Sequence, residues 1–598
     1  MRHEKISTGL LGVWLEWREG GAAALTSHSR SLGITNLGTQ KEPRVIVFVR
    51  CDDAATFPEL AEKGITVNEA SGPLRTAYLP LRELDEFSEH PDVLRIAATH
   101  VAKPKLNIAC PFVHVPEFRA ENGVDGTGVI VGIVDTGIDP NHPNFAGRIM
   151  RIWDQTLTGP GVPEGAFGLE LTGPTIVASR DADGHGTHVA GIAAGADSQF
   201  TGVAPKAGIV FVKTDFNTGH IANGIRYIFR IARELGRPAV INLSLGSHFD
   251  AHDGTDDLSE MIDQLSGPGR IVCCAAGNEA EDNIHARTRI AEGEIARLRF
   301  AVPGQVPPVV LNGWYGPTDI LGVAIEAPDG QRTPFQGAVG KGSHARSFSL
   351  AAGRVMMMTP GVDHTNGDNH FEIQIAGSDS SSAPMAGLWK LLVHGTQTPS
   401  GMLDVWATDL EADSTIHFLD AVADDMKIGS PGAAASALTV GSFTTRTAWQ
   451  DQMGRQHALH LNPDTISPFS SPGPLRNGGP KPDITAPGAV IASALSADSH
   501  PDPEFILSST MRMDLGTSMA TPFITGIVAL LLQCQPELTP EMAKKLLKLG
   551  SRIPDTPPET FSPVWGFGLV DATLLLADDK KSGSRKTRWT PGSSIGVR

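Results

Sequence analysis

A serine in a turn of small residues is the first candidate for chemistry in this chain of 598 residues. Ser518 lies in the segment 516–522, which leads into the apolar run 523–532. Such a run predicts a buried helix. A serine at the N-terminus of a helix can expose its hydroxyl beside backbone N–H groups that are free to receive negative charge. Most Gly-Thr-Ser triplets only begin a helix, so this turn needs support from elsewhere in the chain.

Two upstream segments supply an acid and a base. Asp135 follows the apolar run 129–134. This run predicts a central parallel strand, and open α/β sheets form their sites at the carboxyl ends of such strands. An aspartate in that position can equally cap a turn. His185 and His188 lie three residues apart before small residues that suit a tightly packed helix. This spacing can bind a metal, but no third ligand is evident nearby. A general base beside a packing or hydrogen-bonding histidine is therefore favoured.

The elements that must position these residues alternate between strands and helices. Strands are predicted at 209–213, 240–245, 270–276, 437–440 and 490–493, and helices at 221–235 and from 540 to Gly550. Such alternation predicts a parallel sheet with right-handed crossovers and helices on both faces.

Five segments of the chain resemble those of the subtilisin-like serine peptidases, the subtilases. In chain order they are VGIVDTGID, DGHGTHVAG, INLSLG, AAGNE and GTSMATP. The order Asp, His, Ser is that of subtilisin. The resemblance covers about 107–285 and 428–578, and it implies a subtilisin-like α/β catalytic domain and a serine endopeptidase. The alternative is a catalytically silent binding or regulatory protein with the same fold.

The resemblance also implies a role for each candidate residue. Ser518 is the nucleophile, His185 is the general base and then the acid, and Asp135 orients His185 and stabilises its charged form. The Asn278 side chain and the Ser518 N–H form the oxyanion hole. Because this chain has all of these residues, an active enzyme is favoured over a silent one.

A substrate-binding S1 pocket is implied in the same way. Its lining residues are Ser244, Leu245 and Gly246 on one wall, and Gly277 and Gly429 on the other wall and floor. Small residues there leave room for a large apolar P1 side chain. Glu279 near the rim can also tolerate a basic one.

The N-terminal segment 41–106 predicts a β-α-β-β-α-β order, which is a ferredoxin-like unit. It resembles the subtilase propeptide, an intramolecular chaperone and inhibitor. This likeness predicts self-cleavage within 103–107, with Leu106 as the favoured P1 residue. Residues 1–40 are expected to be a partly ordered leader, and the basic, Gly/Ser-rich segment 579–598 a disordered tail.

Residues 286–427 show many short alternating segments and no convincing helix, so an inserted all-β domain, a sandwich or jelly roll, is expected. Its place between the oxyanion asparagine and the serine is similar to that of the insert in the clostridial Csp proteases. Within it, Asp363, His364, Asp368 and His370 can suggest a metal site. The intervening Asn366-Gly367 favours a solvated hairpin tip instead.

Composition limits the function classes that are expected. A net charge of −17 argues against a nucleic-acid-binding surface, and no apolar run reaches the roughly 18 residues that span a bilayer. Peptides or proteins, including the chain's own propeptide, are the expected partners. No cofactor is required, and although calcium is common in the family no loop here indicates a site. The five cysteines argue against a disulfide framework, and the apolar stretch 10–15 is too short for a typical signal peptide. These two features predict a cytoplasmic protein, with export by a route without a signal peptide as the alternative.

Overall fold

The structure is a computed structural model. It describes residues 42–52, 54–67, 74–98, 109–303, 308–337, 345–377, 383–409 and 416–575, together with isolated residues before 42. Contacts divide the chain into two compact units, 1–105 and 106–598. The predicted cleavage residue Leu106 and the predicted tail 579–598 lie outside the described residues.

The first unit is built on an antiparallel sheet. Its strands run in the order β3 (Thr66–Val67), β4 (Leu74–Pro80), β2 (Arg44–Cys51) and β5 (Val93–Ala98), and β1 (Ile34–Thr35) pairs with the start of β2. A 3₁₀ helix (Pro58–Lys63) follows β2, and a second one (Leu81–Glu83) leads into α3 (Leu84–Glu89) after β4. The order of elements is that of the expected ferredoxin-like unit, although its first helix is 3₁₀ rather than α.

Some residues of the segment 1–40, expected to be a partly ordered leader, belong to the core of this unit. Ile6, Leu10 and Trp14 are all buried in the same core as Val45 and Val47 of β2. Ile6 also forms a β-bridge with Ile96 of β5. Ile6, Leu10 and Trp14 are spaced by four residues, as on one face of a helix, and this weak periodicity was the available signal.

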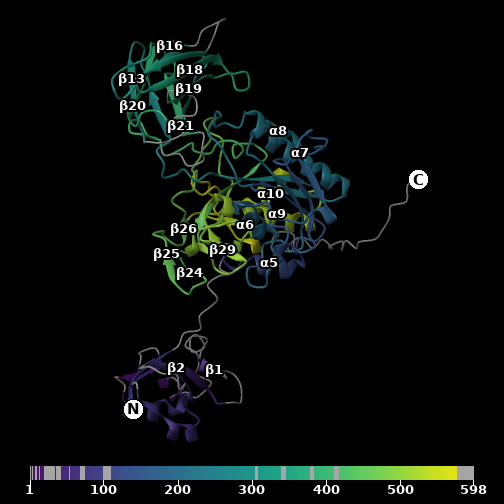
Figure 1. The fold of residues 1–598 in the computed structure, drawn as a ribbon, viewed down its shortest axis with the longest axis vertical. Coiled ribbons are helices and arrows are strands. Elements are labelled where there is room, and N and C mark those ends of the chain that lie inside the picture. The colour runs from purple at the N-terminus through teal and green to yellow at the C-terminus, as the bar shows by residue number, and fades with distance from the viewer. Residues whose placement is uncertain are drawn as a thin grey trace, which may run out of the picture. The chain divides into compact units, whose positions relative to one another are not determined.

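The second unit contains an 11-stranded sheet with a parallel centre (Figure 1). The parallel strands run in the order β27 (Ile484–Ala489), β23 (Leu438–Thr444), β11 (Arg270–Ala275), β10 (Ala239–Leu243), β6 (Ile130–Asp135), β9 (Gly208–Lys213) and β7 (Ile149–Asp154). Short strands extend or flank it: β8 (Leu169–Thr172), β26 (Thr465–Ile466), β31 (Leu569–Val570) and β30 (Ser551–Arg552).

Helices cover both faces of this sheet, as predicted. One face packs against α5 (Val115–Asn122), α6 (His185–Ala194), α9 (Thr517–Cys534) and α10 (Pro540–Leu549), and the other against α7 (Thr218–Glu234) and α8 (Asp257–Leu265). Alternate residues of a strand point to opposite faces. Val131 and Ile133 of β6 therefore lie in the first core, and Ile130 and Val134 in the second.

Helix α9 corrects one expectation drawn from composition. Over its 18 residues the mean hydropathy is 1.5, so by length and composition it could cross a membrane. The expectation that no apolar run is long enough was therefore wrong. In the structure 83% of this window is buried inside the protein, as in a core helix.

The insert is a sandwich of two antiparallel sheets. One runs in the order β12 (His285–Arg289), β21 (Met402–Asp409), β14 (Val309–Tyr315), β19 (Asn369–Ala376), β18 (Gly353–Val362) and β17 (Ala345–Leu350). The other runs β16 (Gln336–Gly337), β15 (Ile320–Glu326), β20 (Gly387–Gln397), β13 (Ile295–Val302) and β22 (His417–Phe418). Apolar side chains of both sheets form one core, which contains Phe300, Phe371 and Trp389.

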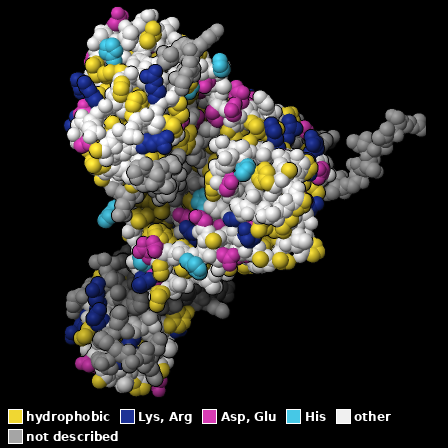
Figure 2. Space-filling model, turned by 45° about the horizontal axis from the view of Figure 1, so that its top comes forward, with side chains coloured by type: hydrophobic (Ala, Val, Ile, Leu, Met, Phe, Trp, Pro, Cys, Tyr) yellow, Lys and Arg dark blue, Asp and Glu magenta, His cyan; other side chains and the backbone are white. Residues whose placement is uncertain are grey.

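Smaller elements complete the second unit: α4 (Ala109–Phe112) and the hairpins β24 (Ala448–Gln450) with β25 (Gln456–Ala458) and β28 (Ile491–Ala494) with β29 (Met511–Asp514). On the face seen in Figure 2, acidic, basic and apolar side chains are interspersed.

Candidate active site

Asp135 and His185 are brought together from the end of a strand and the start of a helix. Asp135 is the last residue of β6 and its side chain is fully buried, whereas His185 is the first residue of α6 and its side chain is 24% exposed. His185 Nδ1 lies 2.7 Å from Asp135 Oδ1. This contact fixes the ring with Nδ1 protonated and leaves Nε2 as the reactive nitrogen. Burial lowers the pKa of His185, but the charge and hydrogen bond of Asp135, together with the charges of Asp514 and Asp183, raise it to about 9.

Asp181 ties together the two loops that carry this pair. Its buried carboxylate accepts hydrogen bonds from the Thr136 hydroxyl (2.8 Å), the Gly184 N–H (2.9 Å) and the Thr187 N–H (2.9 Å). Thr136 follows Asp135, and Gly184 precedes His185. Asp181 thus holds the loop after β6 against the start of α6. Its position at the head of the histidine segment was the available signal, but no role was assigned to it.

His188 serves the structure rather than the chemistry. It is fully buried, and its Nε2 lies 3.2 Å from the Ile491 carbonyl oxygen. Burial lowers its pKa to about 3, so the ring is neutral. Among the described residues no group of three or more His, Cys, Asp or Glu side chains is arranged to hold a metal ion. The buried contact with the Ile491 carbonyl oxygen is what the packing or hydrogen-bonding interpretation of His188 predicts.

Ser518 lies in the first turn of α9, next to Asn278. The Thr517 N–H donates to Asn278 Oδ1 (2.9 Å), and so does the Thr517 hydroxyl (3.0 Å). Because Oδ1 is engaged in this way, the amide Nδ2 of Asn278 remains as the group that can donate outward. The Ser518 hydroxyl donates to the Ser244 carbonyl oxygen at 3.3 Å, and the Ser244 hydroxyl donates to the Ser518 carbonyl oxygen at 2.8 Å. The candidate nucleophile is thus held at the end of β10.

The residues expected to line S1 converge around that strand end. The Ser247 N–H donates to the Ser430 carbonyl oxygen (2.9 Å), which places Gly429 beside the segment 244–246. The Thr517 hydroxyl contacts Gly277 on the other side. A Cβ on Gly277 would collide with the Glu279 carboxylate, and a Cβ on Gly429 would lie 3.0 Å from Asp250 Oδ2. Gly277 therefore lies against the Glu279 carboxylate, which was expected at the rim, and Gly429 lies against the Ser247 carbonyl oxygen and the buried Asp250 carboxylate.

The polar cluster of the insert hairpin has structural partners. The Asp363 carboxylate accepts from the Thr365 N–H (2.8 Å), and His370 stacks on Trp314 with ring centroids 4.7 Å apart. Asp368 forms an ion pair with Arg476 of the catalytic domain at 2.7 Å. The turn is therefore not simply a solvated tip, because it contacts the body of the second unit.

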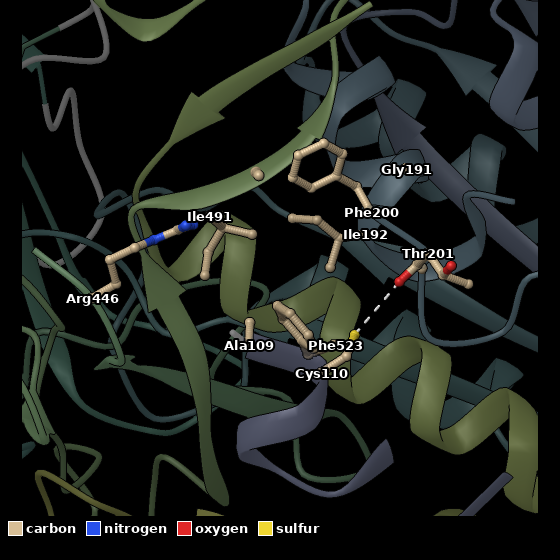
Figure 3. Close-up of a pocket in the computed structure, with 11 residues that line it drawn as sticks. Ala109, Cys110, Gly191, Ile192, Phe200, Thr201, Arg446, Ile491 and Phe523 are labelled. Carbon is tan, nitrogen blue, oxygen red and sulfur yellow. Dashed lines mark hydrogen bonds between the residues drawn. The ribbon is translucent and has the colours of Figure 1, made fainter. Parts of the chain in front are cut away.

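A small cavity lies beside the second half of α6 (Figure 3). Its lining includes Gly191, Ile192, Phe523 and Cys110, whose sulfur lies 3.7 Å from the Thr201 carbonyl oxygen. Burial raises the pKa of the Cys110 thiol to about 12. The thiol therefore stays protonated and is a poor nucleophile, so this cavity adds no chemistry to the site. None of the five cysteines, all of which lie in the described ranges, forms a disulfide.

A comparison with protein families decides the relationship that these motifs indicate. The model of the subtilase family, peptidase S8, matches residues 126–333 and 347–568, which is more than half of the chain. The chain belongs to the subtilase family. The resemblance inferred from the five sequence segments is thus confirmed at the level of the family.

This subtilase is 39% identical over 157 residues to serine protease AprX of Bacillus subtilis, an alignment that covers 25% of the chain and 31% of AprX. It is 35% identical over 162 residues to thermitase of Thermoactinomyces vulgaris, which covers 26% of the chain and 49% of thermitase. The chain therefore matches less than half of the length of either relative.

Among solved structures, the CspB protease of Clostridium perfringens aligns with 79% of this subtilase and 98% of its own chain, at a TM-score of 0.65 and 22% identity. This likeness concerns the fold, and it confirms the expected similarity to the Csp proteases at that level.

Proposed function

We propose that this subtilase is a serine endopeptidase in which Ser518, His185 and Asp135 form the catalytic triad. The observation that carries the proposal is the 2.7 Å contact between the buried Asp135 carboxylate and His185 Nδ1. Ser518 contacts Ser244, which follows β10, the neighbour of β6 in the same sheet. A base oriented by a buried acid is what a serine needs to become a nucleophile.

In the first half of the reaction, Ser518 Oγ turns from the Ser244 carbonyl oxygen to His185 and attacks the substrate carbonyl carbon. Its proton passes to His185 Nε2, and the resulting imidazolium is stabilised by Asp135. The negative oxygen of the tetrahedral intermediate accepts hydrogen bonds from Asn278 Nδ2 and the Ser518 N–H. Thr517 supports this role, because its two donors hold Asn278 Oδ1 and so aim the amide nitrogen.

In the second half, His185 gives its proton to the leaving amine as the peptide C–N bond breaks, and the acyl group remains on Ser518. Water then attacks the ester while His185 accepts its proton, and the acid is released with Ser518 restored. The segment 244–246, which follows β10, supports an extended substrate segment, because backbone groups beyond a strand end can pair with a peptide.

We further propose that the chain's own first unit is a propeptide that the enzyme removes. Its antiparallel sheet and the helical segments 58–63 and 81–89 support this role, and so does the division of contacts between Lys105 and Leu106, within the segment expected to be cleaved.

A fluorophosphonate probe tests the proposed nucleophile. Attack by an activated serine forms an O–P bond and expels fluoride, so we expect labelling of the wild type and none of Ser518→Ala. His185→Gln should also lose labelling, which separates an activated serine from one that is merely exposed. Asn278→Ala should keep some labelling but lower kcat on a peptide by about 10²–10³. A folded wild type that labels neither as the whole chain nor after limited proteolysis of the segment 103–107 is a catalytically silent protein, and that result overturns the proposal.

A further inference from the structure

The predicted S1 pocket contains a carboxylate, that of Glu279, whose negative charge is compensated by the neighbouring His248. The Glu279 carboxylate lies behind Gly277 and accepts a hydrogen bond from the Ser471 hydroxyl at 2.7 Å. His248 Nε2 lies 3.6 Å from Glu279 Oε2. The Glu279 side chain is 27% exposed, so a substrate side chain can reach this carboxylate. An uncompensated carboxylate in such a place attracts a basic P1 side chain, and a compensated one does not.

Hydrogen bonds within the loop 247–256 indicate that His248 is charged. The His252 ring is buried and its pKa is lowered by that burial, so it is neutral. Its Nδ1 lies 3.1 Å from the Asp250 carbonyl oxygen and therefore carries the proton. His252 Nε2 is then an acceptor, and it receives the proton of His248 Nδ1 at 2.9 Å. If His248 were neutral, its Nε2 would carry no proton and its lone pair would face the Glu279 carboxylate. The ring is therefore charged. Burial alone lowers the pKa of His248, but Glu279 outweighs that effect and raises it.

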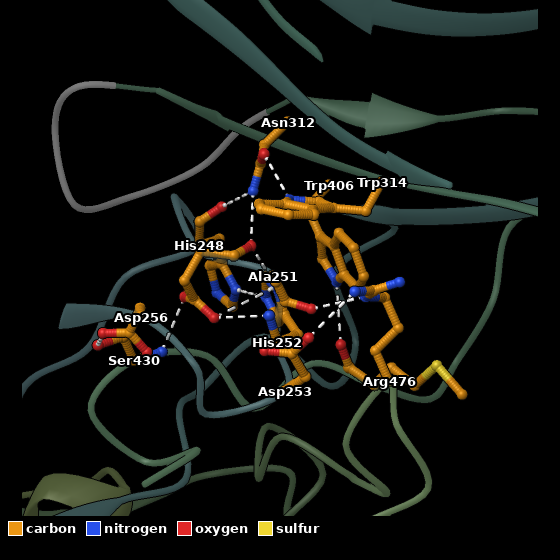
Figure 4. Close-up of polar contacts among 12 residues, drawn as sticks. His248, Ala251, His252, Asp253, Asp256, Asn312, Trp314, Trp406, Ser430 and Arg476 are labelled. Atoms are coloured by element: carbon orange, nitrogen blue, oxygen red, sulfur yellow. Dashed lines mark hydrogen bonds and ion pairs between the residues drawn. The ribbon is translucent and has the colours of Figure 1, made fainter. Parts of the chain in front are cut away.

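The inserted domain holds this loop in place (Figure 4). Asn312 of β14 donates from Nδ2 to the carbonyl oxygens of His248 (3.0 Å) and Asp250 (2.7 Å). Its Oδ1 accepts from Trp314 Nε1 at 2.8 Å, which fixes the orientation of the amide. Trp406 of β21 stacks on His252 with centroids 3.9 Å apart and ring planes at 5°. The Asn312 amide, oriented by Trp314, therefore fixes the backbone of the loop, and the Trp406 ring fixes the plane of His252.

We propose that the inserted domain determines P1 specificity, because Asn312 and Trp406 hold His248 against Glu279 and so keep the charge of the S1 carboxylate compensated. This inference rests on the proposed peptidase function. His248 is then a specificity-determining residue, and Asn312 is a positioning residue that acts through it. The pocket selects an uncharged apolar P1 side chain, and loss of the contact shifts selection toward lysine and arginine.

The second buried asparagine of the same sheet provides a matched control. Asn369 Nδ2 donates to the carbonyl oxygens of Gly316 (3.1 Å), Pro317 (3.2 Å) and Asp319 (3.3 Å), all within the insert. Asn312 and Asn369 are both buried, at 4% and 5% exposure, and they lie on neighbouring strands. Asn→Asp at either position turns carboxylate oxygens against backbone carbonyls, but only at Asn312 do those carbonyls belong to the loop beside S1.

The experiment compares two peptide substrates that differ only in P1, one with phenylalanine and one with lysine. The readout is the ratio of kcat/KM for lysine to that for phenylalanine, with the melting temperature measured for each variant. We expect Asn312→Asp to raise this ratio about tenfold through KM, and Asn369→Asp to leave it unchanged at a similar loss of melting temperature. His248→Gln, which leaves the insert intact, should raise it at least as much. Glu279→Gln in the His248→Gln background should return it toward the wild-type value.

Two results would overturn the inference. One is an unchanged ratio in His248→Gln, and the other is an equal change in Asn369→Asp and Asn312→Asp. If either result is found while the fluorophosphonate probe labels the wild type, the proposed peptidase function holds and only the role of the insert is disproved. An unlabelled wild type removes both.

Discussion

The hydrogen bond between Asp135 and His185 sets the pH range in which the proposed base can work. The pKa of His185 is about 9: burial lowers it, but Asp135 outweighs burial, with smaller contributions from Asp514 and Asp183. A general base must be neutral, so we expect kcat/KM to rise with pH and to reach half of its maximum near pH 9. Rate measurements on one peptide from about pH 6 to about pH 10.5 check this.

The same pair contributes to stability with a defined sign. The charged ring of His185 is favoured in the folded protein, so its contribution to stability is fully present below the ordinary histidine pKa of about 6.5 and is lost as the pH rises through about 9.

Asp135→Asn removes the carboxylate and should lower kcat by about 10⁴. A half-maximal rate already reached near pH 6.5 in the wild type would contradict the raised pKa.

Two residue-scale features were beyond the reach of local patterns. Asp181 lies two residues before the recognised segment DGHGTHVAG, yet its partners Thr136 and Gly184 are known only from the fold. Glu279 was placed near the rim of S1, but its partner His248 lies 31 residues away in sequence and was not singled out. A single polar residue carries no periodicity that would predict such a pair.

At the scale of elements, α6 must approach β6 closely for the pair to form. A Cβ on Gly186 would collide with the Gly137 carbonyl oxygen and lie 2.9 Å from Phe211 Cζ and 3.1 Å from Asp135 Oδ1. We therefore expect Gly186→Ala to push the helix away from the strand, separate His185 from Asp135 and lower kcat/KM by about 10²-fold or more.

Kinetics and thermal unfolding of Gly186→Ala check this, with Gly219→Ala as the control. Gly219 lies in the first turn of α7 on the opposite face of the sheet, where a Cβ would meet only the Asn217 side chain, at 3.2 Å. The control should keep its activity. Full activity in Gly186→Ala would show that the helix tolerates displacement without loss of the pair.

At the scale of the whole molecule, the proposed propeptide can be tested by intact mass. If the second unit cleaves the chain near Leu106, the purified wild type should separate into fragments on either side of that residue, and Ser518→Ala should keep its full mass. Cleavage in both proteins would assign the cut to another protease, and an intact active wild type would exclude a propeptide role. Addition of wild type to Ser518→Ala then shows whether processing also occurs between molecules.

The sequence by itself determined the family, the α/β sheet and the placement of Asp135, His185 and Ser518 at element ends. These properties depend on short contiguous patterns: an apolar run that ends in an acid, small residues after a histidine, and a serine before a buried helix. Strand and helix periods also predicted the all-β character of the insert, because alternation is visible within each strand.

Only the tertiary structure decided which distant segments share a site. Three contacts join residues that are far apart in sequence. Ile6 is buried beside the first unit's sheet, Thr136 donates a hydrogen bond to Asp181, and Asn312 donates to the backbone of the loop that carries His248. Each of these contacts depends on chain reversal and layer packing rather than on local propensity. The proposed compensation of the Glu279 charge therefore depends on the way the insert packs on the catalytic domain, although Glu279 itself belongs to the AAGNE segment.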